Sequence, residues 1–146
     1  MENPLKPNVR LIPAEEVIRD EQLSNKVSVM MDELKNETVR FPSLHVWDSL
    51  VGINLYIIFD EDEGNPVGLI GWIGPTDEAT PRWWIRPSSR RKGYGSPAVE
   101  KLAEEMHRKG VTQIREIEIH TKTVREHMAS RKLAHRLRKC FSKLKG

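Results

Sequence analysis

One segment constrains the fold of this chain most. In it, a strand is followed by a cationic loop with two glycines, and the loop leads directly into a helix. Residues 82–86 have the apolar character of a buried strand, and residues 99–106 place apolar side chains at helical spacing. Between them, residues 90–92 are three consecutive cations, and Gly93 and Gly95 follow. The sequence therefore predicts a strand–loop–helix unit with the loop at the helix N-terminus.

This loop has the chemistry of an anion site. A helix N-terminus presents N–H groups that lack intrahelical acceptors, together with the positive end of the helix dipole. Gly93 and Gly95 let the backbone approach a phosphate without interference from a Cβ atom. Arg90, Arg91 and Lys92 add positive charge. The alternative interpretation is a surface turn whose cations are only solvated.

The remaining elements predict a mixed α/β domain. In chain order we expect a strand at 9–12 stopped by Pro13, one or two helices over 14–35, an antiparallel hairpin at 53–73, a strand near 82–86, a helix from 96–97 ended by Gly110, a strand at 113–121, and a long basic helix at about 123–144. The second half therefore contains a strand–helix–strand crossover.

At the loop the sequence resembles the GNAT superfamily of N-acetyltransferases. The family's pyrophosphate motif, (Gln/Arg)-x-x-Gly-x-(Gly/Ala), is matched by Arg90, Gly93 and Gly95 after an apolar strand and a proline. The resemblance covers roughly residues 8–141 and is strongest in 67–134. It implies a single α/β (α+β) domain over residues 1–146 with a mixed β-sheet flanked by helices, acetyl-CoA as the cofactor, and acetyl transfer to an amine of a small molecule or a protein.

The same resemblance assigns the cofactor-binding residues. The backbone near the motif would hold the coenzyme's pyrophosphate, the strand before it would lie beside the pantetheine arm, and the last helix would approach the thioester. The residues so implied are Trp84, Ile85, Arg90, Arg91, Lys92, Gly93, Tyr94, Gly95, Ser96, His127 and Ser130. For Trp83 and Trp84 the alternative is core packing, and for His127 it is a place on the helix surface.

The last part of the chain departs from the family pattern. The family has Asn-x-x-Ser followed by a tyrosine four residues later, and here His127, Ser130 and Ala134 occupy these positions. Too few residues follow the last helix for the family's closing β-hairpin, so we expect the hairpin to be missing. Its absence would leave the strand at 113–121 as an open edge, from which we expect a homodimer.

The strand at 113–121 also carries the candidates for the catalytic base. Its alternation turns Glu118 and His120 to one side and isoleucines to the other. Histidine or a perturbed carboxylate suits removal of a proton from an amine near neutral pH. A solvated face is the alternative, and His127 and Glu78 are the next candidates for the base.

Composition limits the partners and the setting. The 146 residues include a single cysteine, Cys140, which excludes an internal disulfide, and the five histidines are scattered without metal-ligand spacing. With no apolar run of about 20 residues and no signal-like N-terminus, we expect no membrane association and a cytoplasmic location.

The net charge of +3 is divided unevenly. Residues 1–120 contain 15 Lys/Arg against 20 Asp/Glu, whereas residues 121–146 contain 9 against 1. The basic end could meet nucleic acid, an acidic partner or a phosphorylated ligand. Nucleic acid is not favoured, because Phe141 is the only aromatic residue there to stack on a base. Three functions stay open: an active N-acetyltransferase, a degenerate domain acting by coenzyme binding or protein contact, and a nucleic-acid-binding module.

Overall fold

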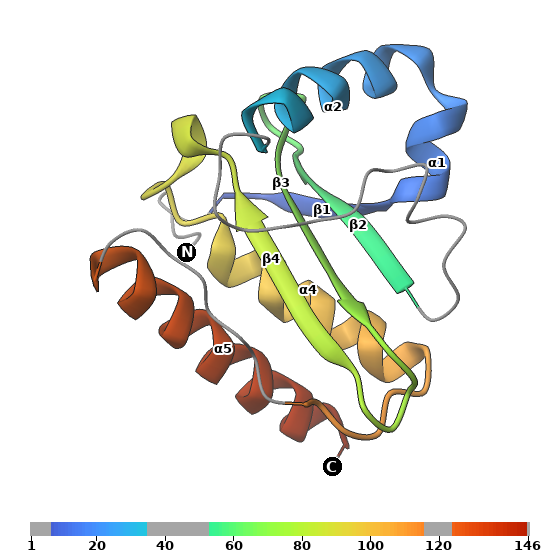
Figure 1. The fold of residues 1–146 in the computed structure, drawn as a ribbon, viewed down its shortest axis with the longest axis vertical. Coiled ribbons are helices and arrows are strands. Elements are labelled where there is room, and N and C mark those ends of the chain that lie inside the picture. Colours follow the sequence, from blue (N-terminus) through green and yellow to red (C-terminus); the bar gives the residue numbers. More distant parts are fainter. Residues whose placement is uncertain (1–6, 35–52, 116–123, 146) are drawn as a thin grey trace.

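The computed structural model describes residues 7–34, 53–115 and 124–145, and Figure 1 shows their arrangement. The elements are, in chain order, β1 (Val9–Pro13), α1 (Ala14–Arg19), α2 (Glu21–Leu34), β2 (Ile53–Asp60), β3 (Asn65–Ile73), β4 (Thr80–Ile85), the short 3-10 helix η1 (Pro87–Ser89), α4 (Gly95–Arg108) and α5 (Val124–Lys145). This order confirms the mixed α/β class predicted from the sequence.

Asp20 divides the predicted helical stretch over residues 14–35 into α1 and α2. Its backbone is extended, with φ −114° and ψ 105°. Its Oδ1 accepts a hydrogen bond from the N–H of Leu23 at 3.1 Å. An aspartate placed in this way satisfies a free donor in the first turn of the next helix. Of the one or two helices expected here, two form.

The four strands make one antiparallel sheet in the order β1-β2-β3-β4. The register pairs Leu11 with Ile58, Ile57 with Leu69, and Leu69 with Trp84. Side chains alternate across the sheet, so every second residue of β2 faces the same layer. The predicted hairpin of β2 and β3 is confirmed.

After α4, the chain returns to the sheet beside the start of β4, in the parallel orientation. Ala79 and Ile114 form a parallel bridge, in which the N–H of Ala79 donates to the carbonyl of Gln113 at 3.1 Å and the N–H of Arg115 donates to the carbonyl of Ala79 at 2.7 Å. This is the crossover expected from the sequence. The rest of the strand predicted at 113–121 lies outside the described residues.

Helices cover both faces of the sheet, so the domain has three layers (Figure 1). On one face α1 and α2 pack on the sheet through Val17, Val27, Met30, Leu55, Ile57, Leu69 and Trp84. On the other face α4 and α5 pack through Val99, Leu102, Met106, Leu137, Phe141, Tyr56, Ile58 and Ile70. No helix within the three described ranges is both long and apolar enough to span a membrane.

The basic helix α5 is continuous, as predicted, and runs parallel to α4. Near its middle, Leu133 lies next to Gly95 at the start of α4. One turn later Arg136 Nε donates to Glu100 Oε1 at 3.0 Å. At its end Lys145 Nζ donates to the carbonyl of Thr112. The helix therefore starts on the side of the cationic loop, and no β-hairpin follows it within the described residues.

In the sequence, apolar residues of this helix at positions 124, 128, 133, 137, 141 and 144 recur at steps of three to five, which predicts one stripe that faces the sheet. Two of these positions do not face the core. Leu137 and Phe141 are buried, but Met128 is 56% exposed and Leu144 is 39% exposed. Met128 precedes Leu137 by nine residues, about two and a half helical turns. It must therefore lie on the opposite side of the helix, and the prediction that it packs inward was wrong.

Candidate functional site

The cationic loop after β4 adopts two left-handed residues. Arg91 has φ 65° and Gly93 has φ 84°. Glycine accepts this conformation freely, whereas a non-glycine residue such as Arg91 is held there at a cost. Turns that mix left-handed with ordinary residues direct successive N–H groups into one concavity that binds anions. The side chains of Arg91 and Lys92 are exposed beside this turn.

The start of α4 adds donors to the same place. The first i→i−4 bond of the helix runs from the N–H of Ala98 to the carbonyl of Tyr94, at 3.2 Å, and Pro97 has no N–H. The N–H groups of Gly95 and Ser96 therefore have no acceptor within the helix. The helix dipole places positive charge at the same end, so an anion in the loop would meet both.

Two arginines fix the base of the loop. Arg90 is half-buried, and its Nε donates to the carbonyl of Ile85 at 2.9 Å, so its side chain folds back on the end of β4. Arg86 Nε pairs with Glu33 Oε2 of α2 at 2.7 Å, and its second nitrogen donates to the carbonyl of Pro66 at 3.2 Å. The sequence did not single out Arg86, because its partners lie far along the chain.

Tyr94 anchors the loop from inside the protein. Its hydroxyl donates to Asp60 Oδ2 at 2.5 Å, and both residues are buried. Asp60 Oδ1 in turn accepts the N–H groups of Asp62 at 2.9 Å and Glu63 at 3.1 Å, which closes the turn after β2. Tyr94 was expected at the cofactor site. Its side chain faces the core, which leaves only its backbone for a ligand.

The pKa shifts of this pair agree with its hydrogen bond. Burial raises the pKa of Tyr94, and the adjacent Asp60 carboxylate raises it further. Burial also acts to raise the pKa of Asp60, but hydrogen bonds from Tyr94 and from the backbones of Glu63 and Asp62 outweigh it and leave that pKa below its usual value. Asp60 is thus the charged acceptor and Tyr94 the donor.

Gly95 has a packing role that the sequence did not reveal. A Cβ atom at this position would lie 2.7 Å from Leu133 Cδ1 and 3.0 Å from its Cδ2. These distances are shorter than ordinary van der Waals contact, so the glycine lets α5 approach the start of α4. From the sequence we expected Gly95 to let the backbone approach a phosphate. In the structure, the absence of a side chain at Gly95 also allows α4 and α5 to come into contact.

The outer edge of β4 offers backbone groups from Trp83 and Ile85. The carbonyl of Trp84 points toward β3, since a Cβ built on Gly68 would lie 2.2 Å from it. The N–H of Arg86 also donates toward β3, to the carbonyl of Val67 at 2.9 Å. Backbone groups alternate along a strand, so those of Trp83 and Ile85 face the other edge.

The two tryptophans of β4 lie in different surroundings. The side chain of Trp84 is buried among the residues under α1 and α2, so the core-packing alternative describes its indole ring. Trp83 packs against the opposite core, while its backbone faces the edge that Ala79 and Ile114 begin to close. The sequence pointed to Trp84 and Ile85 beside the pantetheine arm, and the backbone groups at the outer edge of β4 are those of Trp83 and Ile85.

The proposed catalytic side chains are not placed by the structure. Glu118 and His120 lie outside the described residues. His127 falls in the first turn of α5, but its side chain is not among those described. On the same helix Ser130 and Ala134 are half-buried. Glu78 is exposed and pairs with Arg115 at 3.6 Å, so no base is identified from the described residues.

The mixed sheet, its crossover helix and the cationic, glycine-containing loop at the start of that helix define an acetyltransferase-type α/β domain. A family model described as an acetyltransferase (GNAT) domain matches residues 21–138, and the chain belongs to this family. The resemblance inferred from Arg90, Gly93 and Gly95, and the enzyme class that it implies, are therefore confirmed.

Solved structures of the family share this fold. A Bordetella pertussis protein assigned to the GnaT family of acetyltransferases superposes with a TM-score of 0.64 at 15% identity, covering 94% of this chain and 86% of its own. The Escherichia coli ribosomal-protein-S18-alanine N-acetyltransferase gives 0.57 at 15% identity, with coverages of 89% and 75%. A Vibrio cholerae spermidine N-acetyltransferase in complex with CoA and spermine gives 0.52 at 14%, with 92% and 79%. No curated protein sequence matches significantly.

Proposed function

We propose that this protein is an acetyl-CoA-dependent N-acetyltransferase, which acetylates an amine of a small molecule or a protein. The observation that carries the proposal is the turn at Arg91 and Gly93, whose left-handed residues lead into the free N–H groups of Gly95 and Ser96. Backbone donors, a helix dipole and exposed cations meet there, as binding of a pyrophosphate requires.

The fit of the coenzyme to these residues supports the proposal. The pyrophosphate would lie on the backbone of residues 91–96, with Arg91 and Lys92 at its outer side. The pantetheine arm carries amide groups, and the backbone of Trp83 offers an N–H and a carbonyl at the outer edge of β4. Because Arg90 occupies the carbonyl of Ile85, we assign the arm to Trp83 and to the N–H of Ile85.

Acetyl-CoA supplies an acetyl group already activated as a thioester. The protein has to hold the acceptor amine against the thioester carbonyl, remove its proton and stabilise the charge that develops on the oxygen. We assign proton removal to Glu118 or His120 on the strand that follows α4, directly or through a water. His127 and Ser130, near the start of α5, are the candidates to contact the coenzyme close to the thioester.

The acceptor is proposed as an amine without further definition. The Escherichia coli relative is named for a ribosomal protein and the Vibrio cholerae relative for spermidine, so related folds serve both proteins and small polyamines. The acceptor would be bound near α1, α2 and the segment after them, and residues 35–52 of that segment lie outside the described residues.

One residue favours a second candidate function, coenzyme binding without turnover. Ala134 occupies the position at which the family usually has a tyrosine. That tyrosine commonly gives a proton to the departing thiolate, and alanine cannot. An assay of thiol release with peptides, polyamines or aminoglycosides as acceptors distinguishes the two functions. If the protein binds acetyl-CoA but releases no thiol with any of these acceptors, it has the second function.

The test is calorimetric titration of acetyl-CoA into wild type, Gly93→Ala and Gly110→Ala. Both glycines have φ 84°, so both variants carry the same backbone strain, and a Cβ on Gly110 meets open space. We expect Gly93→Ala to weaken binding at least about tenfold, equal to about 1.4 kcal/mol. Gly110→Ala should bind like wild type, because it lies at the opposite end of α4.

Two outcomes would contradict the proposal. Wild type that gives no heat with millimolar acetyl-CoA has no coenzyme site. Equal weakening in both glycine variants would show that the effect comes from general backbone strain and that the loop is not the site.

A further inference from the structure

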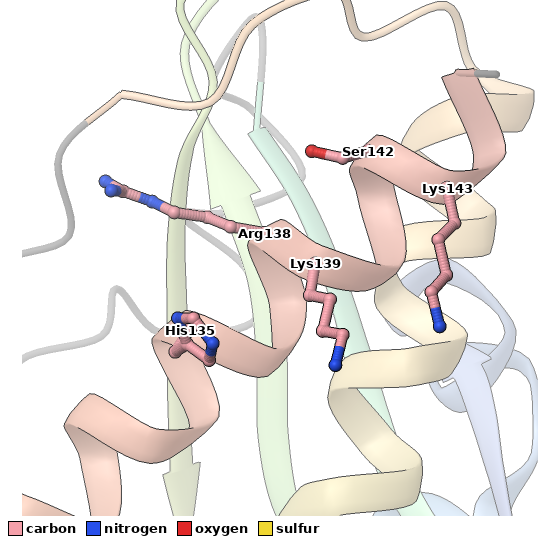
Figure 2. A pocket seen from close by; sticks show the side chains of 5 residues that line it. All are labelled: His135, Arg138, Lys139, Ser142 and Lys143. Carbon is pink, nitrogen blue, oxygen red and sulfur yellow. The ribbon is translucent and has the colours of Figure 1, made fainter.

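The outward face of α5 carries two rows of cations. At 3.6 residues per turn, Arg131 and Arg138 fall in one row and Lys132, Lys139 and Lys143 in another, about 100° around the helix. All five are exposed. Figure 2 shows Arg138 directed away from Lys139 and Lys143, which project together on the other side of a shallow hollow.

A line of small or neutral side chains separates the rows. Met128, His135 and Ser142 follow one another at seven-residue steps and are exposed. From Met128 to Lys145 the helix contains no Asp or Glu. Two other cations are engaged elsewhere, Arg136 with Glu100 and Lys145 with Thr112. The two rows therefore form a field of one sign along roughly 20 Å of helix.

We propose that this face of α5 binds the major groove of duplex DNA, with each row on the phosphates of one strand. The B-form major groove is about 12 Å wide and admits an α-helix. Cations on both flanks of a helix then meet both backbones, and the middle line faces the base edges. Since phosphate contacts carry no sequence information, binding is independent of sequence. This activity is separate from acetyl transfer and does not rest on it.

The geometry favours duplex DNA over other polyanions. The A-form major groove of RNA is too deep and narrow for side chains to read. Single strands require exposed aromatic residues for stacking, and the one aromatic residue of α5, Phe141, is buried. A membrane surface would take the apolar face of an amphipathic helix, and that face of α5 is packed on α4 through Leu137 and Phe141.

The sequence had disfavoured nucleic acid because the basic end lacks interleaved aromatic residues. That reasoning applies to stacking on bases, and a duplex held by its phosphates does not need it. The structure adds that both rows lie on the exposed face of α5, opposite the face that packs in the core, which a count of charges does not show.

The experiment measures anisotropy of a fluorescent 20-base-pair duplex against salt concentration. Each phosphate contact contributes about −0.9 to the slope of log K against log salt, so five contacts predict a slope of about −4.5. The variant Arg138→Gln/Lys139→Gln, with one change in each row, should reduce the slope by about 2 and weaken binding at least tenfold at about 0.1 M salt. The control Arg19→Gln/Arg115→Gln removes the same charge elsewhere and should leave the slope unchanged.

Four outcomes would overturn the proposal. The first is that wild type does not bind the duplex, and the second is that the two double variants weaken binding equally. The third is that polyglutamate or duplex RNA displaces the duplex as readily as unlabelled DNA does. The fourth is that coenzyme A displaces the duplex. The last would assign the face to the coenzyme site. Because all the changed residues are exposed, melting temperatures within about 2 °C of wild type are expected and confirm folding.

Discussion

At the scale of single residues, Tyr94 shows how the cationic loop is held. The backbone of Tyr94 lies in the loop, while its hydroxyl reaches Asp60 at the end of β2. The loop is thereby tied to a turn formed 34 residues earlier in the chain. A site that binds an anion through backbone N–H groups depends on the position of that backbone. We therefore regard Tyr94 as a positioning residue for the coenzyme.

The variant Tyr94→Phe tests this role. It keeps the ring and removes the hydroxyl, which leaves the buried Asp60 carboxylate short of one donor. Loss of a hydrogen bond to a charged group corresponds to about 1.5–3 kcal/mol. We expect a loss of that size in the free energy of unfolding from urea denaturation, together with weaker binding of acetyl-CoA.

Tyr56→Phe is the matched control. Its hydroxyl meets Glu105 at 3.4 Å, a longer bond near the C-terminal end of α4 and away from the cationic loop, so coenzyme affinity should not change. The destabilisation of Tyr94→Phe should also fall at low pH. The folded-state pKa of Asp60 is lowered, so its contribution is present above the unfolded value of about 3.9 and is lost as the pH falls through the folded value. Wild-type affinity in Tyr94→Phe would refute the positioning role.

The sequence predicted the loop but not its anchors. Cations, glycines and a helix start are adjacent in the chain, so their pattern predicts an anion site directly. The partners Asp60 and Glu33 lie far away in sequence, and only the fold brings them to Tyr94 and Arg86. The choice between Trp83 and Trp84 depends on the register of β4 against β3, which composition does not determine.

At the scale of secondary structure elements, α4 and α5 touch through a glycine. Gly95 belongs to the family motif, yet the nearest atoms to a Cβ at this position are those of Leu133. The local pattern of the motif therefore hides a contact between helices. The order of elements was predictable because periodicity is local, but the contact between α4 and α5 was not.

We predict that Gly95→Ala destabilises the protein and that Leu133→Ala relieves the effect. The added methyl group would overpack the contact, and because it meets the end of the half-buried Leu133 side chain, we expect a loss of about 1 kcal/mol, the lower end of the usual range. Leu133→Ala alone should cost stability as well, so the double variant should be more stable than the sum of the two single effects. Urea denaturation of all four proteins measures this coupling.

The coupling separates two roles for Gly95. If Gly95→Ala unfolds like wild type but loses affinity for acetyl-CoA, the glycine serves the phosphate and not the helix contact. If stability falls and the double variant recovers it together with binding, the contact with Leu133 is the primary role.

The same helix shows where pattern reasoning fails. An apolar stripe with steps of three to five residues appeared to include Met128, but errors in step length accumulate along a helix. Over the nine residues from Met128 to Leu137 they amount to half a turn, and Met128 emerges in solvent. Only packing against a second element shows which of the apolar residues face inward.

At the scale of the whole molecule, the domain depends on α5 for one of its two cores. The core under α1 and α2 is complete without it, whereas the opposite core includes Leu137 and Phe141 from α5. The helix is therefore part of the third layer, and its charged outer face is a consequence of that position. A loosely attached basic tail would have the same composition, so the composition alone does not distinguish it from a helix of the core.

The last prediction distinguishes an integral helix from an appendage. Leu137 is fully buried, whereas Leu144 on the same helix is 39% exposed. Leu137→Ala should lower the free energy of unfolding by about 2–5 kcal/mol, through lost burial and the cavity left behind. For a chain of this size that corresponds to a fall in Tm of about 2–4 °C for each kcal/mol.

Leu144→Ala makes the same change in composition and should cost well under half as much, because much of that side chain already meets water. Thermal and urea unfolding of the two variants would decide the matter. Similar small losses in both would mean that α5 is loosely attached, whereas a large loss confined to Leu137→Ala requires that the helix completes the core beside the cationic loop.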